Sequence, residues 1–194
     1  MKRLNRRQRK FQALTRPWRD RLYGVALRSS DGTAMAEDWV QETLLRAWRN
    51  FDDLQDQQLV YAWLLKILDH VIADDRRREV RRNHLAPVIL TDDAQLAKHH
   101  SALPGPFENT LKQQTNDQLI EAIRSLPEEF SKVIILRDLE GLSYREIATI
   151  LSIPQGTVMS RLSRGRRLLS RQLSKEQGKE QATNTPSNTL GMTK

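Results

Sequence analysis

The 194-residue sequence contains no cysteine. Disulfides and thiolate zinc sites both need cysteine, so these are excluded, and the composition fits a reducing cytoplasm. No apolar run approaches the length that spans a membrane. The basic start MKRLNRRQRK is followed by FQALTRPWRDRL, which lacks the continuous apolar stretch of a signal peptide. We therefore expect a cytoplasmic protein with no membrane insertion.

The sequence also lacks internal repeats, the alternating pattern of half-buried strands, and a glycine-rich phosphate loop. Acidic residues are fewer than basic ones, 24 against 32, which gives a formal charge of +8. That excess favours a polyanionic partner, although ribosomal and membrane-surface proteins share it. Hydrophobic residues make up 38% of the chain and charged residues 29%, as is typical of helix-rich globular proteins.

Helical periodicity is present in two stretches separated by a linker that contains LPGPF. We predict an all-α fold of two small helical domains joined by a flexible linker, with a helix-turn-helix in the C-terminal domain. The expected segments are a basic N-terminal tail at 1–10, a first domain at 11–83, the linker at 84–116, a second domain at 117–175 and a polar disordered tail at 176–194.

In the second domain, capping residues divide the pattern into three helices. We expect Ser125 to cap the first helix and Gly141 to follow its end. The next helix has a capping box, because Glu146 lies three residues after Ser143. Pro154 ends that helix, since the residue before a proline is disfavoured in the α region.

The third helix of this domain covers GTVMSRLSRGRRLLSRQL and has two contrasting faces. At 100° per residue, one face is apolar and contains Val158, Leu162, Gly165, Leu169 and Leu173. The opposite face contains Ser160, Arg164, Arg167 and Arg171. Two short capped helices with such a second helix predict a helix-turn-helix that binds DNA. The alternative is an ordinary solvated charged face.

In the first domain, the helix YAWLLKILDHVIADDRRR carries a buried stripe of leucine, valine and isoleucine. Its opposite side combines an aromatic residue with cations, which suits a single DNA strand. The candidate residues for binding such a strand are Trp63, Lys66, His70, Arg77 and Arg81. Trp63 can equally be a core residue, because tryptophan more often packs than stacks on bases.

The preceding helix, AEDWVQETLLRAWRNF, also has an outward face. Its inward positions include Trp39, Thr43 and Ala47. The outward residues mix both charges with an apolar side chain, and this mixture suits a protein partner rather than DNA. The candidate partner-binding residues are Asp38, Gln41, Glu42, Leu45 and Arg46.

Catalysis and metal binding have little support. The acidic pairs at 52–53, 74–75 and 92–93 have no histidine at ligand spacing, and no nucleophile motif is present. His99 and His100 are adjacent, and two neighbouring histidines cannot easily share an ion without further ligands. We expect no enzyme activity, no cofactor and no metal.

Segments from both domains together resemble one protein family. AEDWVQETLLRAW with AWLLKIL and DDRRR, followed after the linker by LPEEFSKVIILRDLEGLSYREIATILSIPQGTVMSRLSRGRRLL, is similar to the extracytoplasmic-function (ECF) group of sigma-70 RNA polymerase sigma factors. The resemblance covers about residues 11–173. It implies that the first domain binds the clamp helices of core RNA polymerase and opens the −10 promoter element, and that the second reads the −35 element as duplex. It also implies an anti-sigma factor as a partner.

The resemblance assigns roles by position. Asp38, Gln41 and Glu42 match the polymerase-contacting surface, and FDDLQDQQL matches the loop that captures a flipped −10 base. The −35 contact positions are Thr157, Met159, Ser160, Arg161, Ser163, Arg164 and Arg167. The chain departs from the family pattern in two places. Relatives often have Arg-Asn where it has Asp69-His70, and usually a cation where it has Met159.

Two other functions remain open at this point. A transcriptional regulator would use the first domain as a sensor or dimerisation domain, and only the helix-turn-helix would touch DNA. The segments EDWVQE, AWLLKIL and DDRRR disfavour that function, because a ligand-sensing domain does not need them. A basic adaptor for RNA would show no sequence preference.

Overall fold

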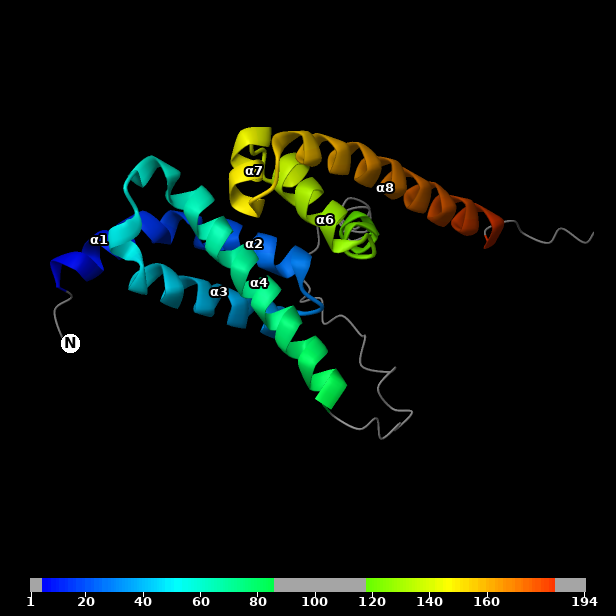
Figure 1. Ribbon diagram of the computed structural model, residues 1–194. Coiled ribbons are helices and arrows are strands. Elements are labelled where there is room, and N and C mark those ends of the chain that lie inside the picture. Colours follow the sequence, from blue (N-terminus) through cyan, green and yellow to red (C-terminus); the bar gives the residue numbers. More distant parts are fainter. Residues whose placement is uncertain (1–4, 86–117, 184–194) are drawn as a thin grey trace, which may run out of the picture.

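The computed structural model describes residues 5–85 and 118–183, which form helices joined by short turns (Figure 1). We name residues 5–85 the first unit and residues 118–183 the second unit. The first unit contains α1 (Arg6–Thr15), α2 (Arg19–Ser29), α3 (Thr33–Arg49) and α4 (Val60–Leu85), with 3-10 turns at Arg16–Trp18, Phe51–Asp53 and Gln57–Leu59. The second contains a helical stretch at 118–124, α6 (Glu128–Ile134), a π-helical segment (Ile135–Leu139), α7 (Tyr144–Leu151) and α8 (Gln155–Thr183).

The basic start of the chain is partly helical, where the sequence predicts a tail. Asn5 caps α1 by accepting a hydrogen bond from the backbone N–H of Gln8, whose side chain accepts from the Asn5 N–H in return. This capping box satisfies two backbone donors. The Phe11 side chain of α1 is only 7% exposed, because it packs against the rest of the first unit. This contact holds α1 in place.

The core of the first unit lies where α2, α3 and α4 meet. Leu22 of α2, Trp39 of α3 and Leu64 of α4 are all at least 96% buried, and α3 packs along both α2 and α4. The apolar stripe predicted for α4 is buried as expected: Leu64, Leu65, Leu68, Val71 and Ile72. This core fixes the outward faces of α3 and α4, where the candidate binding residues lie.

The first cap predicted in the second unit is wrong. Ser125 is not the N-cap of α6, because its hydroxyl donates to the carbonyl of Ala122 at the end of the preceding helical stretch. Pro127 occupies the N-cap position without a side-chain bond. A proline disfavours the α region for the residue before it, so the chain changes direction here and α6 begins at Glu128.

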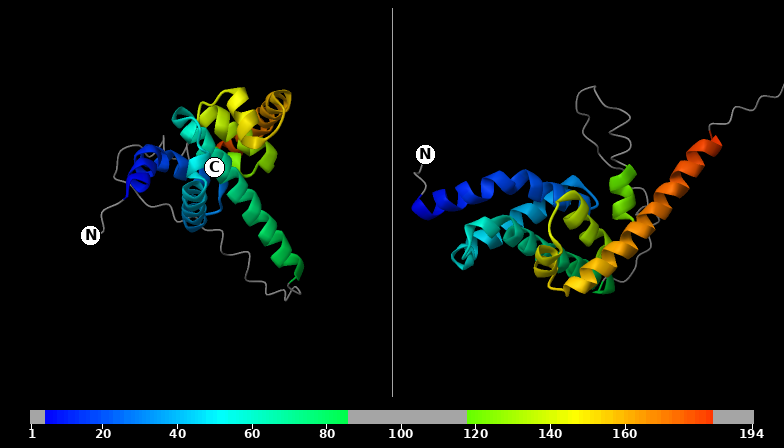
Figure 2. Two further views of the ribbon diagram at one scale, coloured as in Figure 1. Left: turned by 60° about the vertical axis from the view of Figure 1, so that its left-hand side comes forward. Right: turned by 90° about the horizontal axis from the view of Figure 1, so that it is seen from above.

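The helix-turn-helix has the predicted caps. Ser143 and Glu146 form the capping box of α7, and Gly141 before it has φ 73°, in the left-handed region that glycine tolerates. Ser152 ends α7 in the same region, at φ 53°. α8 then extends away from the first unit (Figure 2) and continues to Thr183, into the segment predicted as a disordered tail.

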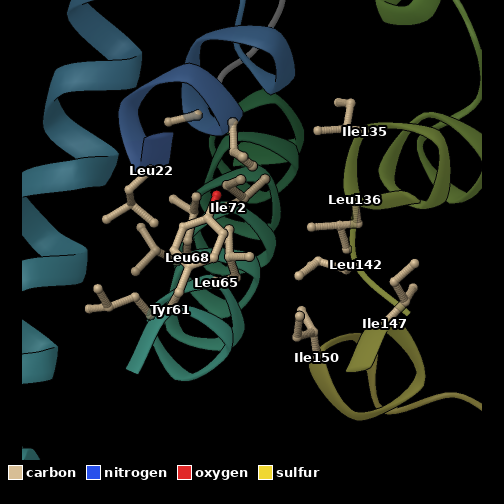
Figure 3. Close-up of a cluster of buried hydrophobic side chains, with 14 of the residues drawn as sticks. Leu22, Tyr61, Leu65, Leu68, Ile72, Ile135, Leu136, Leu142, Ile147 and Ile150 are labelled. Atoms are coloured by element: carbon tan, nitrogen blue, oxygen red, sulfur yellow. The ribbon is translucent and has the colours of Figure 1, made fainter. Parts of the chain in front are cut away.

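The two units share one hydrophobic core, which their separation in sequence does not predict. Figure 3 shows Leu65 and Leu68 of α4 pointing toward Leu136 and Leu142 of the second unit. Ile150 of α7 belongs to the same cluster. The predicted linker lies almost wholly outside the described residues. The units are therefore packed together in this arrangement, which we name the closed arrangement.

Candidate nucleic-acid and protein-binding surfaces

The outer face of α8 carries the predicted basic and hydroxyl residues. Ser160, Ser163, Arg164 and Arg167 are exposed, whereas Val158, Leu162 and Gly165 are buried against α6. Gly165 permits this close packing: a Cβ at that position would lie 2.9 Å from Cδ1 of Ile134. The predicted apolar face is therefore confirmed for these three residues, whereas its other members, Leu169 and Leu173, are half-buried.

Ion pairs divide the arginines of α8 into two groups. Arg161 lies 3.3 Å from a carboxylate oxygen of Glu129, and Nε of Arg166 lies 3.0 Å from Asp138. The bond with Asp138 raises the pKa of Arg166 above its usual value. Among the described residues, Arg164 and Arg167 have no ion-pair partner.

The two free guanidinium groups can therefore bind phosphates or base edges without breaking an internal bond. Met159, beside them, is 48% exposed and supplies no charge. Thr157 is half-buried, and its carbonyl accepts a hydrogen bond from the Ser160 hydroxyl.

The outward face of α3 has an exposed apolar centre. Leu45 is 51% exposed, and Asp38 and Gln41 on the same face are also exposed. Glu42 and Arg46 are half-buried, because Nε of Arg46 donates to Glu42 at 2.7 Å. An exposed leucine surrounded by polar groups is the composition of a protein-binding surface.

An ion-pair network connects this face to α4. Arg46 also donates to Asp74 at 2.7 Å, and Arg77 donates to the other carboxylate oxygen of Asp74 at 2.7 Å. The bonds from Arg46 and then Arg77 lower the pKa of Asp74 below its usual range, and those with Glu42 and Asp74 raise the pKa of Arg46. The structure thus brings residues of two predicted surfaces together.

The candidate single-strand residues lie along one side of α4. His70, Arg77 and Arg81 are exposed, whereas Trp63 and Lys66 are half-buried. The Trp63 side chain packs partly against the core, so it combines a packing contact with an accessible edge. The packing contact of Trp63 is therefore confirmed, and its contact with a DNA base stays a prediction.

Glu140 is the main residue at the unit interface that sequence reasoning missed. Its side chain is only 5% exposed. Nη2 of Arg21 lies 3.0 Å from its carboxylate, the Tyr61 hydroxyl donates to it at 2.6 Å, and Arg28 also pairs with it. Burial, followed by the bond to Glu140, raises the pKa of Tyr61. All three partners belong to the first unit.

Further polar contacts cross the interface. Nζ of Lys132 lies 2.5 Å from Asp69, which departs from the family pattern together with His70. Arg76 pairs with Glu128, and Arg124 donates to the carbonyl of Leu27 at 2.6 Å. Burial alone would raise the pKa of Glu128, but its bonds with Lys132 and Arg76 lower it overall. The acid at position 69 is a departure from the family pattern that the sequence analysis noted without connecting it to an interface.

The acidic pairs that lie in the described residues serve other contacts. Asp52 pairs with Arg7, and Asp75 accepts a hydrogen bond from the Trp39 indole at 3.0 Å. No cluster of three potential metal ligands occurs in residues 5–85 or 118–183. The pair at 92–93 and the histidines at 99–100 lie outside those ranges. None of the helices described here is long and apolar enough to cross a membrane.

Comparisons with known proteins match both units. The family described as "Sigma-70 region 2" matches residues 14–82, and "Sigma-70, region 4" matches residues 116–169. The ECF RNA polymerase sigma-E factor of Haemophilus influenzae is 31% identical over 70% of this chain and 73% of its own length. The RNA polymerase sigma-H factor of Pseudomonas aeruginosa is 28% identical over 86% of this chain and 87% of its own.

Solved structures also match both units. One of them is the sigma factor RpoE of Bartonella quintana in complex with the anti-sigma factor NepR. It is 26% identical, covers 86% of this chain and 98% of its own, and superimposes with a TM-score of 0.70.

Proposed function

We propose how this chain, which belongs to the ECF group of the sigma-70 family and directs transcription initiation by RNA polymerase, divides that function among its surfaces. The outward face of α3 binds core polymerase at the clamp helices. The outward side of α4 binds the opened −10 strand, and the outer face of α8 reads the −35 duplex.

The observation that carries this proposal is the separation of free from paired cations on α8. Internal carboxylates hold Arg161 and Arg166, whereas Arg164 and Arg167 extend from the same helix without a partner among the described residues. A charged face that only kept the protein soluble would not need some arginines paired internally and others left free. A free guanidinium fits the bidentate edge of guanine or a phosphate.

A double substitution on α3 tests polymerase binding. We expect Gln41→Ala with Glu42→Ala to weaken binding to core polymerase by about 2 kcal/mol or more, as the loss of interface hot spots does. The melting temperature should change little, because Gln41 is exposed and surface ion pairs such as Glu42–Arg46 stabilise weakly. Fluorescence anisotropy with labelled protein and core enzyme measures the affinity.

The matched control removes the same two side-chain types elsewhere. Gln12 on α1 and Glu79 on α4 are exposed and lie off the α3 face. The variant Gln12→Ala with Glu79→Ala should bind core polymerase like the wild type. Equal affinities for the two double variants would contradict the assignment of α3.

The −35 assignment predicts different results for neighbouring positions of α8. Arg164→Ala should cost roughly 1–3 kcal/mol and relax the preference at one base pair. Arg166→Ala is the control, because Asp138 already holds that guanidinium. Met159→Arg should add one phosphate contact and steepen the slope of log K against log salt by about 0.9. Full-length protein with core enzyme is titrated against duplex variants. Equal losses for Arg164→Ala and Arg166→Ala would contradict the proposal.

The closed arrangement constrains how both elements are engaged. The −10 and −35 elements are numbered by base-pair position, so they lie roughly 25 base pairs apart, or about 85 Å along B-form DNA. α7, an 8-residue helix about 12 Å long, lies between α4 and α8 and contacts both. Because α7 contacts both α4 and α8, the helices with the two reading surfaces are close neighbours, and we expect that they cannot reach both elements at once. We therefore expect the units to separate when the chain binds a promoter.

An anti-sigma factor is a third partner in this proposal, after core polymerase and promoter DNA. The structure of Bartonella quintana RpoE in complex with NepR aligns with both units of this chain, which supports a regulator that binds the closed arrangement. The proposed site of action is the cytoplasm, where core polymerase and promoter DNA are found. Pull-down from cells that recovers polymerase subunits alone under every growth condition would contradict the anti-sigma partner.

A further inference from the structure

The excess positive charge of this chain is concentrated at its start. The first 19 positions contain 8 of the 32 basic residues and none of the 24 acidic ones. The remaining residues therefore carry 24 basic and 24 acidic side chains, and the whole formal charge of +8 belongs to the opening segment. The basic residues of that segment are Lys2, Arg3, Arg6, Arg7, Arg9, Lys10, Arg16 and Arg19. Such a local excess favours binding to a polyanion.

Part of this segment lines an open hollow of about 570 Å³. One wall belongs to α1 and the other to the segment between α3 and α4. The walls include Arg6, Arg7 and Lys10 on one side and Phe51, Asp52 and Gln57 on the other. The second wall is part of FDDLQDQQL, the segment that matches the family's base-capturing loop.

Aromatic packing fixes α1 against this segment. The ring of Phe11 meets that of Trp48 at 5.3 Å and that of Phe51 at 5.2 Å, edge to face in both pairs. Arg7 lies over the Trp48 ring at 4.2 Å and pairs with Asp52 at 3.0 Å. These contacts hold the cations of α1 at a set position beside the loop, so they do not need to be ordered when a ligand binds.

The internal pairing leaves two cations for a ligand. Asp52 neutralises Arg7, whereas Arg6 and Lys10 are exposed and have no ion-pair partner among the described residues. They lie one helical turn apart on the same side of α1. The hollow therefore presents two free positive charges and no free carboxylate.

We propose that this hollow binds the phosphate backbone of the single DNA strand beside the base held by the loop at residues 51–59. The inference rests on the proposed function, because it needs the loop to hold an opened −10 strand. Arg6 and Lys10 supply charge but no shape that distinguishes bases, so the contact is independent of sequence. It increases the affinity for any opened strand that the loop has selected.

The experiment uses the full-length protein with core polymerase and a single-stranded −10 oligonucleotide, across a salt series. We expect Arg6→Gln with Lys10→Gln to reduce the slope of log K against log salt by about 1.4, which is about 0.7 for each lost phosphate contact. The ratio of the wild-type affinity to the affinity of the variant should then fall about sevenfold between 50 and 200 mM salt. The control, Arg9→Gln with Arg16→Gln, removes the same charge from exposed positions that do not line the hollow.

A second measurement locates the contact on the DNA. Neutral methylphosphonates replace the phosphates of the oligonucleotide one at a time. Wild-type binding should weaken at one or two positions next to the captured base, and the Arg6→Gln, Lys10→Gln variant should be insensitive there. This arm does not depend on the folding of the variant, because the wild type alone must show the sensitive positions.

The outcomes separate this inference from the proposed function. Equal slopes for the variant and the control, or no sensitive phosphate in the wild type, would overturn the hollow as a strand-binding site. So would a loss of core polymerase binding by the variant with unchanged strand binding by the assembled complex. Failure of the wild-type complex to prefer the −10 strand over a scrambled one would instead contradict the proposed function.

Discussion

Replacing Glu140 with alanine is expected to separate the two units while leaving each of them helical. The Glu140 side chain is 5% exposed and binds Arg21, Arg28 and Tyr61 of the first unit. Removing one partner of a buried ionic network costs roughly 3–5 kcal/mol, and we expect the lower end here because Arg21 and Arg28 are 46% and 22% exposed. Separation lets the arginines return to water. The ratio of closed to open molecules should therefore fall by about a hundredfold or more.

The absence of native cysteine makes the measurement direct. Dyes on Asp31→Cys in the first unit and Ser170→Cys in the second report the separation by resonance energy transfer, and both positions are exposed. Glu79→Ala is the control, since Glu79 is an exposed glutamate of α4. Energy transfer should decrease in Glu140→Ala and stay at the wild-type value in Glu79→Ala. An unchanged distance in both variants would contradict the role of Glu140.

The open variant also separates two properties of the protein. If the closed arrangement must open before a promoter is bound, Glu140→Ala should bind a promoter with both elements more tightly than the wild type does. Binding to core polymerase should be less affected, because the α3 face lies outside the interface. Lys132–Asp69 and Arg76–Glu128 still cross the interface in this variant, so the prediction requires that Glu140 contributes more to the closed arrangement than these two pairs do.

Much of the helical architecture could be predicted because it depends on local chemistry. The capping box of Ser143 and Glu146 satisfies backbone groups within one turn, so sequence spacing alone is sufficient to identify it. The buried stripe of α4 follows from the 3.6-residue period in the same way. The cap predicted at Ser125 failed because two start signals lie close together there, and Pro127 controls where α6 begins.

The contact between the units could not be predicted, because it is a long-range feature. Leu136 and Leu142 look like core residues of their own domain, and periodicity does not say which helix covers them. An acid just before Gly141 looks like an ordinary solvated helix end. Glu140 is buried only because α2 and α4 bring three donors to it, and those lie about 80 to 120 positions earlier in the sequence.

The candidate surfaces were partly predictable for the same reason. Helical projection gave the outward residues of α3, α4 and α8, because each face belongs to a single helix. It did not show that Asp138 and Glu129 bind Arg166 and Arg161, since those acids come from other elements. The hollow beside α1 was missed because the sequence suggested a tail, and its second wall belongs to a distant segment.

The second large effect is expected at the contact between α6 and α8. A Cβ on Gly165 would lie 2.9 Å from Cδ1 of Ile134 and 3.1 Å from Cβ of Phe130. Gly165→Leu would add three more carbons in the same space and push α8 away from α6. We expect the free energy of unfolding to fall by about 3 kcal/mol, at the upper end of typical overpacking costs. Urea unfolding followed by circular dichroism measures this change.

The matched control is Gly156→Leu, in the same helix. A Cβ on Gly156 would meet no atom within 4 Å, so the added side chain causes no clash there. Leucine favours the helix over glycine, and stability should stay level or rise slightly. If both variants unfolded at the same urea concentration, the close approach at Gly165 would not be what positions α8. If only Gly165→Leu is destabilised, Val158 and Leu162 lose their packing along with it. The outward arginines then lose the fixed orientation that reading a duplex requires.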